Sequence, residues 1–162
     1  MINKKLKIDY IKNIYQLDDS FNKKSSSLFE TKTFLKIFAD SKCIGGNSGW
    51  NPIFSVIHEE NKQVGFIPMF EKYNSYGEYV FDWEWANFFS RYQVKYYPKL
   101  VIALPFTPIV TNKFVINKDI KIDEWINDIV DFATEKNYSS VHFLHLSKNH
   151  LDFFSNEEFF FR

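Results

Sequence analysis

The segment Pro52–Phe70, PIFSVIHEENKQVGFIPMF, decides the framework of the fold. Its two ends, Pro52–Ile57 and Gln63–Phe70, are rich in β-branched and aromatic residues, and the polar run His58–Asn61 separates them. Apolar runs on either side of a short polar turn are typical of a β-hairpin. Pro68 has no N–H to donate to a sheet ladder, so we expect it at an edge or a bulge. The segment therefore predicts two strands paired with each other.

Further elements are predicted on both sides of this hairpin. Upstream, the alternation in LKIDYI predicts a strand at Leu6–Ile11, and Ser27–Glu30 has the spacing of a capping box before a helix at Thr31–Asp40. Downstream, the sequence predicts a buried strand at Leu100–Leu104, a helix at Asp123–Lys136 and a strand at Val141–Leu146. This order of strands and helices indicates one α+β domain over residues 1–162, with a mixed sheet.

Composition narrows the classes of function. The chain has 162 residues, of which 45% are apolar and 20% aromatic, enough for a folded domain with a core. The rings exceed what a core of this size needs, so we expect some of them to line a groove or to meet a partner. The 20 basic and 20 acidic residues cancel, which argues against DNA or another nucleic acid as the main ligand.

Targeting and redox features are sparse in this sequence. Cys43 is the only cysteine, which excludes a disulfide framework and a thiolate metal cluster. The opening MINKKLKIDY has no apolar stretch behind its charges, so it does not resemble a signal peptide. The most apolar run, Leu100–Val110, is too short for a membrane helix and contains prolines. We therefore expect a cytoplasmic chain without a membrane span.

The segment Ser75–Trp85, SYGEYVFDWEW, interleaves carboxylates with large rings. If it is a strand, alternate side chains point to opposite faces. One face would then carry Tyr79, Phe81, Trp83 and Trp85, and the other Tyr76, Glu78, Val80, Asp82 and Glu84. The pattern alone favours a half-buried strand with a solvated acidic face, and the alternative is a carboxylate pair for proton transfer or for binding an amine or a cation. In both interpretations the rings pack into the sheet and the carboxylates face outward.

Two other groups of polar residues invite a functional interpretation. Lys99 directly precedes a buried strand, where it would neutralise an anionic substrate group or pair with Glu78 or Asp82. An ion pair between neighbouring strands would explain it equally well. His142 and His145 lie three residues apart in an expected strand, so their side chains point to opposite faces and cannot share one metal ion. We therefore expect no metal site.

Four stretches, taken in order, resemble the FemAB-like proteins, which are often labelled peptidoglycan biosynthesis/recognition or GNAT-family N-acyltransferase. They are Gly49–Pro52 (GWNP), Ser75–Ala86 (SYGEYVFDWEWA), Tyr96–Leu100 (YYPKL) and Pro105–Pro108 (PFTP). The helix within LFETKTFLKIFADS also fits the opening helix of that family, so the resemblance extends from about Leu28 to Arg162.

This resemblance implies an α+β fold of the GNAT-like (acyl-CoA N-acyltransferase-like) type, with a mixed, mostly antiparallel sheet flanked by helices. Chains of the family resemble two such folds in tandem. This sequence ends in FFFR, Phe159–Arg162, before the second half would begin. We therefore expect the amino-terminal half alone, with its last phenylalanines uncovered.

The resemblance also implies a reaction, the transfer of an acyl or aminoacyl group to an amine, with a peptidoglycan-type precursor as the acceptor. Glu78 or Asp82 would act in catalysis by positioning or deprotonating the amine, while substrate contacts would come from Tyr76, Trp83, Tyr97, Lys99 and Thr107. The donor would be an acyl-CoA or an aminoacyl-tRNA. The sequence lacks the [QR]xxGx[GA] loop that holds the pyrophosphate of coenzyme A.

Two rival interpretations stay open at this point. The chain is either half of an acyltransferase, which needs a separate carboxyl-terminal half or self-association for activity, or a non-catalytic module that binds a sugar-peptide. A third possibility is a non-functional gene fragment. Product formation with the complementary half separates the first two, and a cooperative melt of the isolated chain argues against the third.

Overall fold

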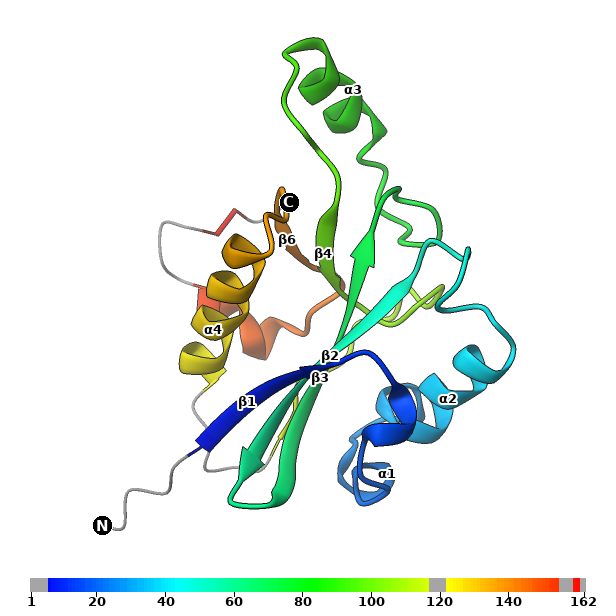
Figure 1. The fold of residues 1–162 in the computed structure, drawn as a ribbon, viewed down its shortest axis with the longest axis vertical. Coiled ribbons are helices and arrows are strands. Elements are labelled where there is room, and N and C mark those ends of the chain that lie inside the picture. Colours follow the sequence, from blue (N-terminus) through cyan, green and yellow to red (C-terminus); the bar gives the residue numbers. More distant parts are fainter. Residues whose placement is uncertain (1–5, 117–121, 155–158, 161–162) are drawn as a thin grey trace.

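A computed structural model describes residues 6–116, 122–154 and 159–160 (Figure 1). The strands are β1 (Leu6–Ile11), β2 (Asn51–Glu59), β3 (Lys62–Lys72), β4 (Lys99–Ile102), β5 (Val115–Ile116) and β6 (Val141–Phe143). The α-helices are α1 (Phe21–Lys24), α2 (Lys32–Asp40), α3 (Trp83–Arg91) and α4 (Ile122–Glu135). Shorter 3₁₀ helices are η1 (Ile14–Gln16), η2 (Leu28–Glu30) and η3 (Lys148–Phe154).

The predicted hairpin is confirmed and forms the middle of the sheet. The strand order is β1-β2-β3-β4-β6, with β5 paired to β3, and among the described strand pairs only β4–β6 is parallel. Pro68 lies opposite Phe54 in an interior strand, so the expectation of an edge or a bulge there is wrong. On its other edge, β3 pairs with β5 up to Phe66 and with β4 from Met69 onward. Pro68 falls between these two partners, where a missing N–H is tolerated.

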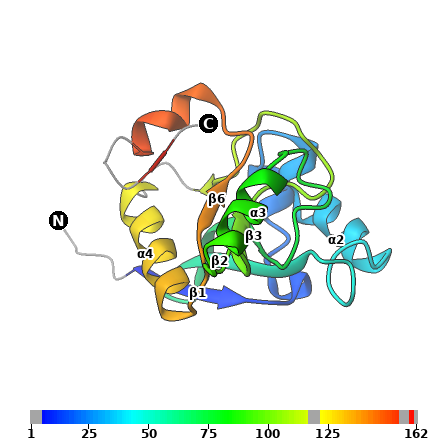
Figure 2. The ribbon, with the colours of Figure 1, turned by 90° about the horizontal axis from the view of Figure 1, so that it is seen from above.

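Helices cover both faces of this sheet. The helices α1 and α2 lie on one side and α4 lies on the other (Figures 1 and 2). Alternate residues of β2 follow this division, because Phe54 and Val56 join the core under α2 while Ile53 and Ile57 join the core under α4. With both faces buried, the middle stretches of β2 and β3 are mostly apolar on both sides rather than alternating. The predicted class, α+β with a mixed and mostly antiparallel sheet, is confirmed.

The predicted helices α2 and α4 are present, but the start of α2 differs from the expected capping box. Ser27 caps the short helix η2 by accepting a hydrogen bond from Phe29 N (3.3 Å), whereas Thr31 caps α2 by accepting one from Phe34 N (3.1 Å). Glu30 is buried and accepts a hydrogen bond from Ser26 Oγ (2.8 Å). The carboxylate therefore points into the protein rather than back to the Ser27 amide.

The segment Ser75–Trp85 is not a strand, and the predicted placement of its rings and of two of its carboxylates is wrong. Residues 75–82 form a loop, and α3 begins at Trp83 and projects from the end of the sheet (Figure 1). Glu78 and Asp82 are buried, each 3% exposed, while Phe81 is 83% exposed. No residue of α3, which the structure describes in full, is fully buried. The rings thus face solvent, and Glu78 and Asp82 face the interior, whereas Glu84 is exposed.

The last described residues are partly covered. Phe159 packs against Phe143 and Phe154, with ring centroids 6.2 and 5.0 Å away, whereas Phe160 is 86% exposed. The expectation that the terminal phenylalanines lie uncovered is therefore wrong for Phe159, and Phe161 falls outside the described residues. Among the described helices, none is long and apolar enough to cross a membrane.

Gly77 provides a test of how the loop packs on the body of the protein. Its φ is +77°, and a Cβ there would lie 2.6 Å from the Phe106 ring and 3.1 Å from Trp50 Nε1. We expect Gly77→Ala to lower the free energy of unfolding by more than about 2 kcal/mol, because left-handed strain and steric overlap add. Chemical denaturation measures this value.

Gly46→Ala is the matched control for that variant. Gly46 also has a positive φ, +55°, but no atom of the described residues lies within 4 Å of the position that its Cβ would take. Only the backbone strain of about 1 kcal/mol therefore remains in this variant. Equal losses in the two variants would contradict the described packing of Gly77 against Phe106.

Candidate functional site

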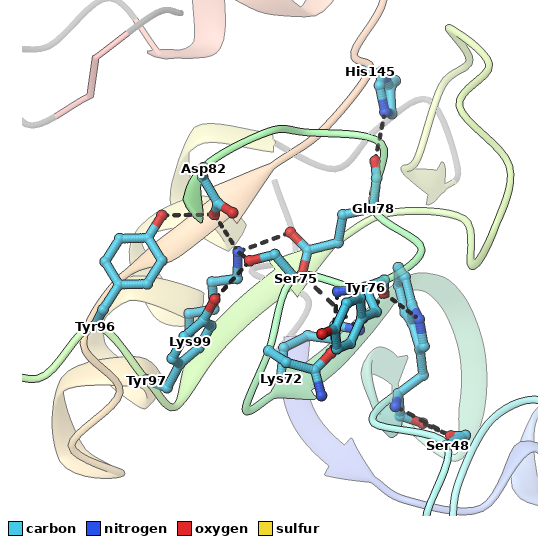
Figure 3. A network of polar contacts seen from close by, with 12 residues as sticks. Ser48, Lys72, Ser75, Tyr76, Glu78, Asp82, Tyr96, Tyr97, Lys99 and His145 are labelled. Atoms are coloured by element: carbon cyan, nitrogen blue, oxygen red, sulfur yellow. Dashed lines mark hydrogen bonds and ion pairs between the residues drawn. The ribbon is translucent and has the colours of Figure 1, made fainter. Parts of the chain in front are cut away.

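The four stretches singled out in the sequence meet at one end of the sheet. Gly49–Pro52 leads into β2, Ser75–Ala86 spans the loop and the start of α3, Tyr96–Leu100 leads into β4, and Pro105–Pro108 follows β4. Side chains and backbone atoms from three of these stretches form a connected polar network (Figure 3). The fourth contributes the Phe106 ring, which lies against Trp50 with centroids 5.4 Å apart.

Lys99 is the centre of this network. Its Nζ donates to Glu78 Oε2 (2.8 Å), to Asp82 Oδ2 (2.7 Å) and to Ser75 Oγ (2.8 Å), and its side chain is fully buried. Tyr96 adds a further donor, because its hydroxyl lies 2.6 Å from Asp82 Oδ2. One ammonium thus ties both ends of the loop 75–82 to the first residue of β4. The predicted pairing of Lys99 with Glu78 or Asp82 is confirmed, and it involves both.

A second buried lysine, Lys72, lies on the other side of Glu78. Its Nζ donates to Tyr76 O (2.9 Å), lies 3.8 Å from the centroid of the Trp50 ring, and is 4.0 Å from Glu78 Oε1. Lys72 and Lys99 are also register partners in the β3–β4 pair. Like charges opposite each other in a sheet repel, so the two carboxylates of the loop compensate a cost that the strand register creates.

Burial and these contacts move the pKa values of the two carboxylates in opposite directions. Burial raises the pKa of Glu78, and hydrogen bonding and attraction from Lys99 offset this only in part. Burial also acts to raise the pKa of Asp82, but the donors Lys99, Ser75 and Tyr96 outweigh it and lower that pKa. Asp82 is therefore the firmly ionised partner of Lys99, and Glu78 is the group that takes up a proton more readily.

Two carboxylate oxygens in the network have no hydrogen-bond partner among the described residues, namely Glu78 Oε1 and Asp82 Oδ1. Burial in turn lowers the pKa of Lys72 to about 8, despite the attraction of Glu78. The Glu78–Lys72 pair is thus the part of the network in which a proton is most easily gained or lost.

Three of the seven described non-glycine residues with a positive φ lie in or against the same loop. Tyr79, Phe106 and His145 have φ values of +58°, +54° and +52°, which is unusual for bulky residues. Tyr79 lies in the loop, Phe106 packs against Gly77, and His145 Nε2 lies 3.2 Å from Glu78 O. Such conformations persist only where surrounding contacts enforce them, and they gather at functional sites. The strain therefore supports a functional role for this loop.

The remaining predicted site residues differ in how they are placed. Tyr76 and Trp83 are 69% and 53% exposed, and their ring centroids are 6.4 Å apart. Tyr97 is half-buried, with its hydroxyl 2.9 Å from Ser75 Oγ. Thr107 donates to Pro105 O (2.9 Å), a local contact within its own turn. The structure thus joins Tyr97 to the Lys99 network and leaves the hydroxyl of Thr107 outside it.

Sequence reasoning missed Trp50, Lys72 and Tyr96 as parts of the site. Trp50 Nε1 donates to Tyr76 O (3.1 Å), so Trp50 and Lys72 hold the same carbonyl. A signal was available for each, because Trp50 and Tyr96 lie in two of the quoted stretches, and Lys72 ends a strand with a mostly apolar middle. A lysine in such a position is buried only when it has partners.

A third buried lysine, Lys113, lies outside this network. Its Nζ donates to Thr111 Oγ1 (2.9 Å), His145 O (3.0 Å) and Ile109 O (3.2 Å). Burial lowers its pKa to about 8, and Glu30 counteracts this only through its charge.

In the described part of the chain no group of three or more His, Cys, Asp and Glu side chains is placed to hold a metal ion.

Comparison with known families assigns the chain to one of them. The FemAB-like family, described as peptidoglycan biosynthesis/recognition, matches residues 11–162, which is most of the chain. The chain therefore belongs to the FemAB-like family. Comparison with curated proteins and with solved structures gave no significant match.

The compensation of charge within the network is testable by removing its central cation. Lys99→Met leaves Glu78 and Asp82 buried without their shared partner, so we expect the free energy of unfolding to fall by about 3–5 kcal/mol. The matched control is Glu84→Gln, an exposed carboxylate in the same segment, which should change stability by less than about 0.5 kcal/mol. Urea denaturation of both variants measures their free energies of unfolding. A Lys99→Met protein as stable as the parent would contradict the described network.

The lowered pKa of Lys113 predicts a pH dependence of stability. Between pH 8 and 10.5 the unfolded chain keeps a proton that folded Lys113 has released, so stability rises with pH, by at most about 3 kcal/mol for this group. The lowered pKa of Lys72 also makes stability rise with pH. The raised pKa values of Tyr10 and Tyr138 oppose this rise above about pH 10. Denaturation curves from pH 8 to 10 measure the slope.

Variants separate the contribution of Lys113 from that of other groups. Lys113→Met should flatten the rise of stability between pH 8 and 10, whereas the exposed control Lys136→Met should leave it unchanged. The same slope in both variants would show that Lys113 keeps its ordinary pKa in the folded chain.

Proposed function

We propose that this chain is the acceptor-binding part of an N-acyltransferase that attaches an acyl or aminoacyl group to an amine of a peptidoglycan-type precursor. The family match supports the substrate class and the transferase chemistry. The observation that carries the proposal is the Ser75–Asp82 loop, which presents exposed rings on a base of buried, mutually compensated charges. A rigid surface of this kind binds a ligand without losing much conformational entropy.

In this proposal Tyr76 and Trp83 are the residues that touch the substrate. Both rings are more than half exposed and lie edge to face, an arrangement that offers flat apolar surfaces beside polar backbone groups. The carbonyl of Tyr76 is held by Trp50 Nε1 and Lys72 Nζ, so the ring projects from a fixed backbone. Tyr97 and Thr107 are proposed as further contacts at the edge of this surface.

For Glu78, Asp82 and Lys99 we propose a positioning role rather than direct contact with the amine. Each is almost fully buried, and the two carboxylates share the Lys99 ammonium through Glu78 Oε2 and Asp82 Oδ2. Of the two, Glu78 keeps the better capacity to accept a proton, because its pKa is raised and its Oε1 has no hydrogen-bond partner among the described residues.

The proposal includes a GNAT-like second half, by resemblance to the tandem family, which supplies the other wall of the site and the donor, an aminoacyl-tRNA or an acyl-CoA. A non-catalytic module that binds a sugar-peptide is the second candidate. It is favoured by one observation, namely that the groups able to do acid–base chemistry are buried while the ring surface is exposed.

Both candidate functions require the chain to bind a peptidoglycan-type ligand, and a binding experiment tests this requirement. Titration calorimetry with a soluble disaccharide-pentapeptide of peptidoglycan should give a measurable affinity that Tyr76→Ala and Trp83→Ala each weaken at least tenfold, because central aromatic contacts dominate binding energy. Tyr15→Ala removes an equally exposed ring, 55% exposed, away from the loop and should have no effect. Equal affinities in all three variants would refute the assigned surface.

Turnover then separates the enzyme from the binding module. The chain is mixed with a separately produced second half and with either donor, and mass spectrometry looks for the acylated amine. Product that depends on the chain supports the transferase, and binding without product supports the module. A chain that neither melts cooperatively nor binds the fragment would be the non-functional remnant.

A further inference from the structure

Helix α3 carries an exposed aromatic stripe on the face opposite to Trp83. Trp85, Phe88 and Tyr92 are spaced by three and four residues, and their exposed fractions are 44%, 50% and 67%. The rings form a continuous row, since Trp85 lies 6.4 Å from Phe88 and Phe88 lies 4.8 Å from Tyr92. At about 100° per residue, Trp83 points to the other side of the helix. The stripe is therefore separate from the proposed substrate surface.

The spacing of the stripe is that of a coiled-coil seam. With Trp85 and Tyr92 at a positions, Phe88 is at a d position. Phe81 precedes the helix, and its ring lies 6.3 Å from that of Trp83, so it is not part of the stripe. A seam of a and d rings on a helix that projects from the body can pack against a second helix of the same pattern.

The charges beside the stripe specify which second helix fits. Glu84 and Arg91 are both exposed, lie seven residues apart on α3 and occupy the two g positions. Neither forms an ion pair within the part of the chain that the structure describes. In an antiparallel pair of helices, g positions face g positions. Glu84 of each copy therefore lies opposite Arg91 of the other copy, which gives two such pairs. A parallel pair would place Glu84 beside Phe89 instead and would leave the charges unmatched.

We propose that the chain self-associates through α3, as a two-fold symmetric dimer with the two helices antiparallel. In this register Trp85 of each copy packs on Phe88 of the other copy. The contact is isologous, because each residue of a pair meets its counterpart in the same way on both sides. The helix has only nine residues, so the dimer is weak and forms as the protein concentration rises.

Sedimentation velocity of the 162-residue chain over a wide concentration range tests this proposal. The parent should shift from monomer to dimer with increasing concentration. Phe88→Ser should weaken dimerisation about tenfold or more, since it removes a central ring of the seam. Circular dichroism melts verify that the variant folds. A parent that stays monomeric throughout would overturn the proposal and leave the stripe to another partner, such as a second half of the protein.

A charge swap tests the antiparallel register independently of the rings. Glu84→Arg and Arg91→Glu should each weaken the dimer, because each places like charges in contact, whereas the double variant Glu84→Arg/Arg91→Glu should regain the parental dimerisation constant. Glu135→Arg, an exposed charge reversal at the end of α4, is the control for net charge and should not alter dimerisation. Loss in both single variants without recovery in the double variant would refute the proposed pairing.

Discussion

The fully buried ammonium of Lys99, held between Glu78 and Asp82, is the contact on which the exposed loop depends. Lys99 begins β4 and stands opposite Lys72 in the sheet register, so two cations are brought together in the interior. Burial of either lysine is favourable only with compensating charge nearby. The loop 75–82 supplies that charge from both of its ends, and in doing so it turns its carboxylates inward and its rings outward.

This constraint links the core of the fold to the surface where a ligand would bind. Trp50 and Lys72 hold the carbonyl of Tyr76, and Phe106 packs against the position of Gly77, so the backbone beneath the exposed rings is held from three directions. Positive φ values at Tyr79 and Phe106 show that the chain is held in strained conformations there. The network therefore preorganises the loop, and a change in any of its charges is expected to act on the position of Tyr76 and Trp83 at a distance.

The sequence predicted the regular elements well and the loop poorly, for a physical reason. The β2–β3 hairpin, α2 and α4 follow from local patterns, namely apolar runs around a polar turn and apolar residues at helical spacing. The alternation in SYGEYVFDWEW has the same appearance as a half-buried strand, but the burial of Glu78 and Asp82 follows from the pairing of Lys72 with Lys99, which depends on a register that joins distant segments. The quoted family stretches converge in space at this network, whereas the face that each residue occupies could not be inferred from their order.

The most direct test of the account is amide hydrogen exchange, compared between the parent and Lys99→Met under conditions in which both are folded. We expect faster exchange in the segment from Ser75 to Ala86, whose amides are ordered by the Lys99 contacts, and unchanged protection in the β2–β3 hairpin. Equal exchange of that segment in the two proteins would contradict the claim that Lys99 holds the loop in place.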